Sequence, residues 1–240
     1  MEIDTQLIPI PPDPKILSKK NVVVIDVLRA TTVIVYALSQ GAMEIIPVAS
    51  IEEAKERAKT FSQGATLLGG ERNSQKIEGF DLGNSPTEYS EERIKGKRII
   101  LTTTNGTRAF YWVSSGNQIF IGSFLNIGAV AMRCVTLDRD LLIFLSGNRG
   151  GFSLEDTVCA GMLIDLILKN GEKPITLTDA SYDALFLYQR FEENLIGAFH
   201  LSSHGKDLLE LGGGGDLIFC AQTNITEVVP LFKDGVIRIF

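Results

Sequence analysis

The chain has 240 residues, of which 45% are hydrophobic and 22% charged, and its formal net charge at pH 7 is -6. This composition is that of a globular protein with a sizeable core, and the acidic excess excludes a nucleic-acid-binding surface, which needs basic residues. The N-terminal residues lack the features of a secretory signal, and no segment approaches the roughly 18 apolar residues that cross a bilayer. We therefore expect a cytoplasmic protein that binds neither nucleic acid nor membrane.

Short apolar runs rich in Val, Ile, Leu and Phe recur along the chain and predict strands that are buried on both faces. Between most of them lie helix-start residues: Ser50, Ser85 and Ser153 each precede an acidic residue by three positions, as in a capping box. Alternating strands and helices predict an α/β protein with three α/β/α layers and a mostly parallel or mixed sheet. Pro230 and Gly235 predict a short antiparallel strand pair near the C-terminus. The predicted strands are Asn21–Asp26, Glu44–Val48, Thr66–Gly70, Lys97–Thr103, Gln118–Ile121, Asp140–Ser146, Asp216–Cys220 and Val236–Phe240.

The domain organisation follows from the absence of any low-complexity linker, which favours a single α/β domain over residues 1–240. A weak repetition suggests two loosely similar halves, about 1–122 and 123–240. Arg29 and Arg149 each lie three residues after the polar end of a predicted strand, and Arg72 lies in a third strand-to-loop segment. Similarities of six residues also arise by chance, so duplication and coincidence both remain open. The shared position predicts that the three arginines converge at the carboxyl edge of the sheet, where α/β proteins bind ligands.

The three arginines indicate an anionic ligand, because a guanidinium binds phosphate, sulfonate or carboxylate through paired hydrogen bonds. Arg29, Arg72 and Arg149 together favour a small polyanionic metabolite. The segment Leu101–Thr107 adds hydroxyls and backbone N–H groups at a predicted helix start, which can also hold an anion. A plain capped turn is the alternative for this segment. The candidate binding residues in it are Thr103, Thr104, Asn105, Gly106 and Thr107.

Acidic residues fall in or beside the same loops, and carboxylate oxygens near a phosphate site are typical Mg²⁺ ligands. Asp26 ends an apolar strand, where a carboxylate is costly unless it is paired or binds a metal. A salt bridge to Arg29 is the alternative explanation. Glu155 and Asp156 lie in the first turn of a predicted helix, where acids also stabilise the helix dipole without any metal. The candidate metal ligands are Asp26, Glu71, Asp81, Glu155 and Asp156.

Two further segments carry polar residues of interest. The Gly79–Pro86 loop could fold over the sheet edge and present Asp81 and Asn84 to a ligand, or it could be a purely structural connection. His200 and His204 have the spacing of a zinc site, but no acid stands in the usual position beyond them, so we do not expect zinc. The sequence lacks a P-loop, a C-x5-R cysteine-phosphatase motif and a D-x-D motif after its first predicted strand. A phosphatase in this chain would therefore be of another design.

Six motifs occur in a fixed order along the first two thirds of the chain. They are V-V-I-D-V-L-R-A-T-T, G-G-E-R-N, G-F-D-L-G-N-S-P, L-T-T-T-N-G-T-R-A, G-S-F-L-N and F-S-L-E-D-T-V-C-A-G. Together they closely resemble the 2-phosphosulfolactate phosphatase family. The resemblance spans Val22–Gly161, with a looser match at Ser203–Gly205 and Asp216–Cys220.

The resemblance implies an α/β/α fold and a Mg²⁺-dependent phosphatase that converts 2-phospho-3-sulfolactate to 3-sulfolactate and phosphate, a step of coenzyme M biosynthesis. A related 2-phospho-hydroxyacid remains open as the substrate. On this hypothesis Asp26, Arg29 and Glu71 are catalytic, and Arg72, Arg149, Asn84 and the 103–107 residues bind the substrate. Attack by water and attack by Asp26 through an aspartyl-phosphate both remain open.

Two functions from other classes are compatible with the same residues. The first is a non-catalytic small-anion-binding or sensor protein that uses the arginines without turnover. The second is a metal-assisted isomerase or lyase that acts on a carboxylate substrate. The sequence is also compatible with a homodimer and does not determine the oligomeric state.

Overall fold

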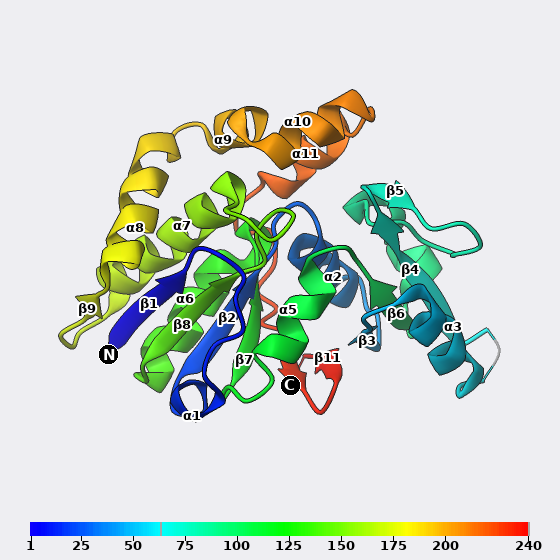
Figure 1. Ribbon diagram of the computed structural model, residues 1–240, viewed down its shortest axis with the longest axis horizontal. Helices are drawn as coiled ribbons and strands as arrows, with labels where there is room; N and C mark the ends of the chain where they lie inside the picture. Colours follow the sequence, from blue (N-terminus) through cyan, green and yellow to red (C-terminus); the bar gives the residue numbers. More distant parts are fainter. Residues whose placement is uncertain (63, 240) are drawn as a thin grey trace.

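The computed structural model describes residues 1–62 and 64–239 and places one mixed sheet between two layers of helices (Figure 1). The strand order is β5-β4-β6-β3-β11-β10-β7-β2-β8-β1-β9. The predicted α/β class is confirmed. The strands are β1 (Glu2–Gln6), β2 (Asn21–Ile25), β3 (Glu44–Pro47), β4 (Thr66–Arg72), β5 (Gln75–Lys76), β6 (Arg98–Thr102), β7 (Ile119–Gly122), β8 (Leu141–Leu145), β9 (Thr176–Leu177), β10 (Leu231–Lys233) and β11 (Val236–Arg238).

The helices cover both faces of the sheet, and α9–α11 lie across one end of it (Figure 1). In the described residues, no helix combines the length and the apolar character needed to span a membrane. The helices are α1 (Pro14–Leu17), α2 (Ala30–Ser39), α3 (Ile51–Lys59), α4 (Glu91–Ile94), α5 (Gly106–Trp112), α6 (Ile127–Leu137), α7 (Leu154–Asn170), α8 (Asp179–Phe191), α9 (Leu195–Leu201), α10 (Ser203–Glu210) and α11 (Gly214–Cys220), with 3₁₀ turns η1 (Pro86–Glu88) and η2 (Phe124–Asn126).

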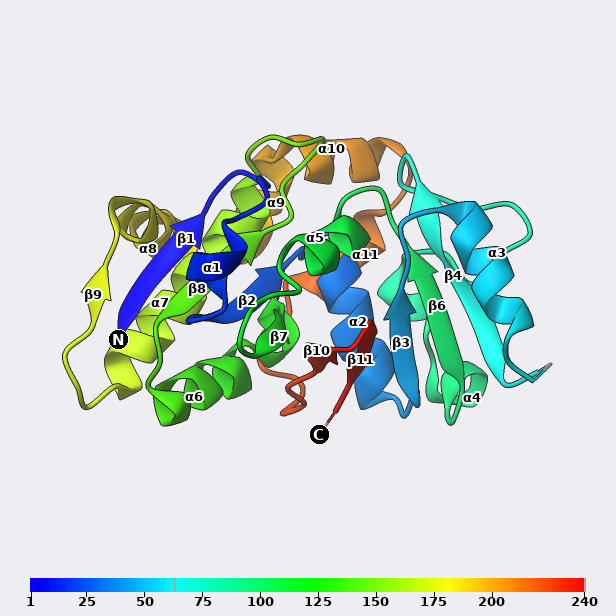
Figure 2. The same cartoon turned by 60° about the horizontal axis from the view of Figure 1, so that its bottom comes forward.

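The sheet consists of two groups of parallel strands joined by a hairpin. One group is β9, β1, β8, β2 and β7, and the other is β3, β6 and β4, with the short strand β5 antiparallel to β4 at the edge. The antiparallel hairpin β10–β11 connects β7 to β3, as predicted from Pro230 and Gly235. Figure 2 shows β4 and β6 pointing toward α10. The strand β8, from the second half of the sequence, lies between β2 and β1 from the first half, and the internal repeat stays a prediction.

Alternate residues of β2 enter two different cores, because successive side chains of a strand point to opposite faces. Val23 and Ile25 pack with residues of α6 and α7, whereas Val22 and Val24 pack with residues of α2 and α5. All four side chains are fully buried. This explains why the strand reads as a continuous apolar run rather than an alternating one.

Seven of the eight predicted strands are confirmed with small shifts of their ends, although Phe240, the last residue of the predicted C-terminal strand, lies outside the described residues. The predicted strand Asp216–Cys220 is wrong, since these residues form most of the helix α11. Leu217 and Cys220 are buried while Ile218 between them is exposed, which is helical spacing. A run of only a few apolar residues does not distinguish a strand from a helix. The strands β1, β5 and β9 were not predicted.

Two of the three predicted caps are confirmed. The Oγ atoms of Ser50 and Ser153 accept hydrogen bonds from the backbone N–H groups three residues later. The predicted cap at Ser85 is wrong: its Oγ forms hydrogen bonds with the side chains of Thr87 and Asp216 instead, and only the 3₁₀ turn η1 follows it. Long-range side-chain contacts therefore replace the local cap at this position.

Candidate active site

Asp26 lies immediately after β2 and faces a small cavity. Its Oδ1 accepts a hydrogen bond of 3.1 Å from the N–H of Ala30, and the hydroxyl of Thr31 bonds to both its backbone N and O. Its Oδ2 accepts no hydrogen bond from the residues that the structure describes. A Cβ at position 106 would lie 2.6 Å from this Oδ2, so Gly106 is what allows the loop after β6 to approach so closely. The Asp26 carboxylate is thus positioned but keeps one oxygen free.

The small cavity has a volume of about 10 Å³, which is room for about one water molecule. It adjoins a cleft of about 390 Å³, because Glu71, Ser74, Asn105 and His204 line both. The cavity therefore accepts one atom or ion, while the cleft accommodates a small metabolite. The cavity is lined by Asp26, Leu28, Arg29, Glu71, Ser74, Asn84, Thr103, Asn105 and His204.

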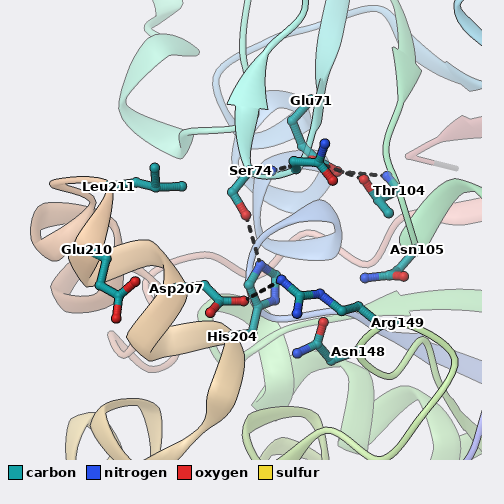
Figure 3. A pocket seen from close by; sticks show the side chains of 11 residues that line it. Glu71, Ser74, Thr104, Asn105, Asn148, Arg149, His204, Asp207, Glu210 and Leu211 are labelled. Carbon is teal, nitrogen blue, oxygen red and sulfur yellow. Dashed lines mark hydrogen bonds and ion pairs between the residues drawn. The ribbon is translucent and has the colours of Figure 1, made fainter.

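The cleft lies between the carboxyl ends of the strands and α10 (Figure 3). Glu71 at the end of β4 and Thr104 after β6 form one side of it. Arg149 after β8 and His204 on α10 form the other side. Four segments that are distant in the sequence thus build one site, as expected for the carboxyl edge of an α/β sheet.

The Glu71 carboxylate is held by the loop after β6. It accepts hydrogen bonds from the N–H of Thr104 at 2.7 Å, from the hydroxyl of Thr104 at 3.1 Å and from the N–H of Ser74 at 2.8 Å. The backbone N–H of Thr104, which the sequence predicts to bind an anionic ligand, therefore donates to a carboxylate of the protein itself. Glu71 is fixed in the wall shared by the cavity and the cleft.

Arg29 is buried in the wall of the small cavity. Its Nη1 lies 2.5 Å from Oδ2 of Asp216, and its Nη2 donates a 3.0 Å hydrogen bond to the carbonyl of Ser74. A guanidinium has five N–H donors, so these two bonds leave three for a ligand. The predicted alternative, a salt bridge between Asp26 and Arg29, is wrong because the partner of Arg29 is Asp216.

Arg149 stands at the exposed rim of the cleft, where its side chain is 77% accessible. Its Nη2 donates a hydrogen bond of 2.9 Å to Oδ2 of Asp207 on α10. A surface pair of this kind is worth less than about 1 kcal/mol, so an anionic ligand can exchange with Asp207 at little cost. Arg29 and Arg149 therefore offer one buried and one exposed cationic group to the same cleft region.

Burial dominates the electrostatics beneath the cavity. It raises the pKa of Asp26 from an ordinary value near 3.8 to about 7, with the charges of Glu71 and Glu155 adding to the effect. Burial also raises the pKa of Asp156, and the neighbouring carboxylates Asp26 and Glu155 add to that increase. His204 has a pKa lowered by burial, which Glu155 opposes from 3.8 Å. Several like charges therefore crowd the region behind the cavity.

Comparison with known proteins agrees with this geometry. The family model for 2-phosphosulpholactate phosphatase matches residues 10–235. A protein named probable 2-phosphosulfolactate phosphatase from Caldanaerobacter subterraneus is 46% identical over 92% of this chain and 91% of its own length. A protein of the same name from Symbiobacterium thermophilum is 42% identical over 95% of this chain and 97% of its own length. Another from Clostridium acetobutylicum is also 42% identical, over 91% of this chain and 92% of its own length.

The chain belongs to the 2-phosphosulpholactate phosphatase family. The resemblance stated from the six motifs is thereby confirmed, and so is the enzyme class that it implies, a phosphoric monoester hydrolase.

The structure of this phosphatase-family chain brings together several of the predicted site residues and leaves others apart. Thr103 lines the cavity but also exchanges hydrogen bonds with Thr107, so the capped turn that was the alternative is present as well. Asp156 accepts a hydrogen bond from the N–H of Val27 and so supports the loop of Asp26 from behind. The residues brought to the cavity or cleft are Asp26, Arg29, Glu71, Asn84, Thr103, Thr104, Asn105 and Arg149.

The predicted residues that line neither the cavity nor the cleft are Arg72, Asp81, Gly106, Thr107, Glu155 and Asp156. Arg72 donates to the backbone carbonyl of Glu71 and to the hydroxyl of Thr102, and it lines a separate hollow beside α3. The carboxylate of Asp81 accepts a hydrogen bond from the N–H of Leu68 and holds the Gly79–Pro86 loop against β4. The expected convergence of three arginines is therefore found for two of them. Asp216 and His204, which were not predicted as site residues, take part instead.

The donor atoms of the cavity suit a hard divalent cation. Asp26 contributes a free carboxylate oxygen, and the buried Oδ1 of Asn84 has no hydrogen-bond partner among the described residues. Within residues 1–62 and 64–239, no group of three or more His, Cys, Asp or Glu side chains is arranged to hold a metal ion. Mg²⁺ commonly binds through one or two carboxylates together with water and substrate phosphate, so a complete protein cage is not required. These residues fit Mg²⁺ in that form.

The raised pKa of Asp26 predicts how stability depends on pH without a divalent cation. Between about pH 4 and 7 the folded chain keeps a proton on Asp26 that the unfolded chain has released, so the free energy of unfolding should fall as pH rises. Asp156 contributes in the same direction. Replacing Asp26 with Asn should flatten this dependence and stabilise the chain at pH 8 by on the order of 2–4 kcal/mol.

Urea unfolding in EDTA at several pH values measures the effect. Adding MgCl₂ at pH 8 should raise the unfolding midpoint of the original chain more than that of D26N, because the variant lacks the carboxylate. Equal pH profiles for the two proteins would show that Asp26 is not the buried group that titrates.

Proposed function

We propose that this chain is a Mg²⁺-dependent phosphatase that hydrolyses 2-phospho-3-sulfolactate, or a closely related 2-phospho-hydroxyacid, to the hydroxyacid and phosphate. The observation that carries the proposal is the small cavity, whose wall combines the free Oδ2 of Asp26 with the unused N–H donors of Arg29. A carboxylate and a guanidinium facing the same space are what a phosphoryl group needs in a site of this class. Family membership supports the same activity.

The sizes of the two spaces support a proposal for where each part of the substrate binds. The cavity holds only about one water, so the phosphoryl group would lie at its mouth with one oxygen inside, within reach of Arg29. The remaining anionic groups would occupy the wider cleft, where Arg149 can leave Asp207 to bind a carboxylate or sulfonate. Asn105 and Ser74 line both spaces and are placed to donate hydrogen bonds between these two anionic ends. This arrangement favours a substrate with several anionic groups over a simple alkyl phosphate.

Asp26 and Asn84 are the residues that would hold Mg²⁺, with Glu71 and Glu155 adding negative charge nearby. When bound, the ion would neutralise phosphate charge and polarise the ester. The side chain of Asp26 can act on phosphorus itself or accept a proton from an attacking water, because its Oδ2 makes no hydrogen bond to the described residues and Asp26 lines the cavity. The place in coenzyme M biosynthesis that the resemblance implies is part of the same proposal.

A screen of phosphorylated hydroxyacids tests the function. Purified protein with MgCl₂ should release inorganic phosphate from 2-phospho-3-sulfolactate, as followed by phosphorus NMR, and EDTA should stop the release. 2-Phospholactate, which lacks the sulfonate, and glycerol 2-phosphate, which also lacks the carboxylate, should be turned over with successively lower kcat/KM. Phosphate release from none of these compounds would favour an anion-binding or sensor protein. A rearranged organic phosphate as the product would identify an isomerase or lyase.

A further inference from the structure

Asp216 connects Arg29 to the helices that cover the cleft. It lies in the first turn of α11 and is 187 residues away from Arg29 in the sequence, yet both side chains are buried and their charged atoms are 2.5 Å apart. The second carboxylate oxygen, Oδ1, accepts a hydrogen bond of 2.6 Å from the hydroxyl of Ser85. Each oxygen of Asp216 therefore has its own partner, and the carboxylate is fixed from two sides.

The contacts of Arg29 leave its orientation dependent on Asp216. Besides that carboxylate, only the carbonyl of Ser74 accepts a hydrogen bond from this guanidinium among the described residues. Ser74 lies in the turn after β4, and its carbonyl accepts the hydrogen bond from Nη2 of the Arg29 guanidinium. Two contacts at different nitrogens determine the plane of a guanidinium, whereas one contact leaves it free to rotate. Without Asp216, the guanidinium would no longer be held in one plane beside the cavity that Arg29 lines.

We propose that Asp216 is a positioning residue that orients the Arg29 guanidinium toward the transferring phosphoryl group. The inference rests on the proposed function, and Asp216 acts through Arg29 without touching the substrate. Ser85 supports the carboxylate in turn, which explains why its hydroxyl is used here rather than as a helix cap. The loop before η1 and helix α11 thus set the geometry of a residue that follows β2.

Asp216→Asn separates positioning from simple charge effects. Removing a negative charge near an anion site should tighten the binding of every anion, whereas losing the orientation of Arg29 should weaken an anion that resembles the transition state. Phosphate stays tetrahedral when bound, whereas vanadate can take a fifth oxygen ligand in a phosphoryl-transfer site and then has the trigonal bipyramidal shape of the transition state. We therefore expect D216N to bind phosphate within about threefold of the original affinity, and vanadate at least about tenfold more weakly. The value of kcat should fall by about 10- to 100-fold while KM stays the same or decreases.

A double-mutant cycle with Arg29→Met tests whether the effect passes through Arg29. The double variant R29M/D216N carries no unpaired buried charge, so it should fold better than R29M alone. In the R29M background, D216N should change vanadate affinity by less than about twofold. D216E should partly restore the vanadate affinity that D216N loses, because it returns the carboxylate. An equal loss from D216N in both backgrounds would overturn the proposal.

The matched control is Glu44→Gln at the start of β3, which removes another buried carboxylate, here one that pairs with Arg98 of β6 and Arg238 of β11. This variant should lose stability but keep the phosphate-to-vanadate ratio. Isothermal titration with MgCl₂ present measures both anions without turnover, so the cycle can be read even if no tested substrate is hydrolysed. An unchanged ratio in D216N, or no binding of either anion by the original chain, would overturn the role of Asp216.

Discussion

Replacing Asp26 with Asn should reduce phosphate release by at least about 10³-fold while the protein remains folded. The substitution keeps the size of the side chain and the Oδ1 acceptor for the N–H of Ala30, so the loop after β2 retains its hydrogen bond. What it removes is the charged Oδ2 that faces the cavity. Because that oxygen is proposed both to bind Mg²⁺ and to act on phosphorus, its loss should affect kcat far more than KM.

The measurement is kcat with saturating MgCl₂, together with urea unfolding to confirm the folded state. Glu44→Gln serves as the control for removing a buried carboxylate away from the cavity and should keep kcat within about threefold. Turnover of D26N within tenfold of the original would contradict the assignment of Asp26.

Adding beryllium fluoride to the original chain distinguishes the two modes of attack, since a covalent-like adduct on Asp26 excludes direct attack by water.

Arg29→Met should lower kcat/KM by about 10³-fold, the range found when an arginine that stabilises a transferring phosphoryl group is removed. Arg29→Lys keeps the positive charge beside Asp216 but loses the planar fork, so we expect an intermediate loss of about 10²-fold. R29M also leaves the buried Asp216 without its cationic partner and should be destabilised by about 3–5 kcal/mol.

Activity must therefore be expressed per folded molecule, with circular dichroism or unfolding data for each variant. The comparison of R29K with R29M is informative because only the first keeps the buried charge pair. If R29K matched the original chain, charge alone would suffice and the fork geometry would be irrelevant. If R29M lost less than tenfold, Arg29 would have to be removed from the site.

The neighbouring residues Glu71 and Arg72 illustrate how local pattern limits a site prediction. The sequence suggested both as site residues because they lie in the loop that follows the predicted strand Thr66–Gly70. Successive side chains of a strand point to opposite faces, so when Glu71 faces the cavity, Arg72 must point away from it. The structure extends β4 through Arg72, two residues beyond the predicted strand, so the alternation of faces applies to both side chains.

Asp216 and His204 show the opposite case, in which no local pattern identifies the residue. Asp216 follows a run of glycines, and the short apolar run after it was read as a strand. Its role depends on Arg29 and Ser85, which are both distant in sequence, and on the packing of the helix α11 that carries it. His204 reaches the cavity because α10 crosses the carboxyl edge of the sheet. The sequence signals for these two residues were the looser matches to the family motifs at Ser203–Gly205 and Asp216–Cys220.

The sequence by itself determined the elements whose pattern is local: the buried strand predicted over Asn21–Asp26, the caps at Ser50 and Ser153, the C-terminal hairpin and the acid at the carboxyl end of β2. Hydrophobic period and capping act over a few residues, so they can be read in order along the chain. Only the tertiary structure decided which groups meet in the cavity and that Arg29 pairs with Asp216 rather than with Asp26. Such pairings depend on how distant segments pack, and the pattern of neighbouring residues does not encode that packing.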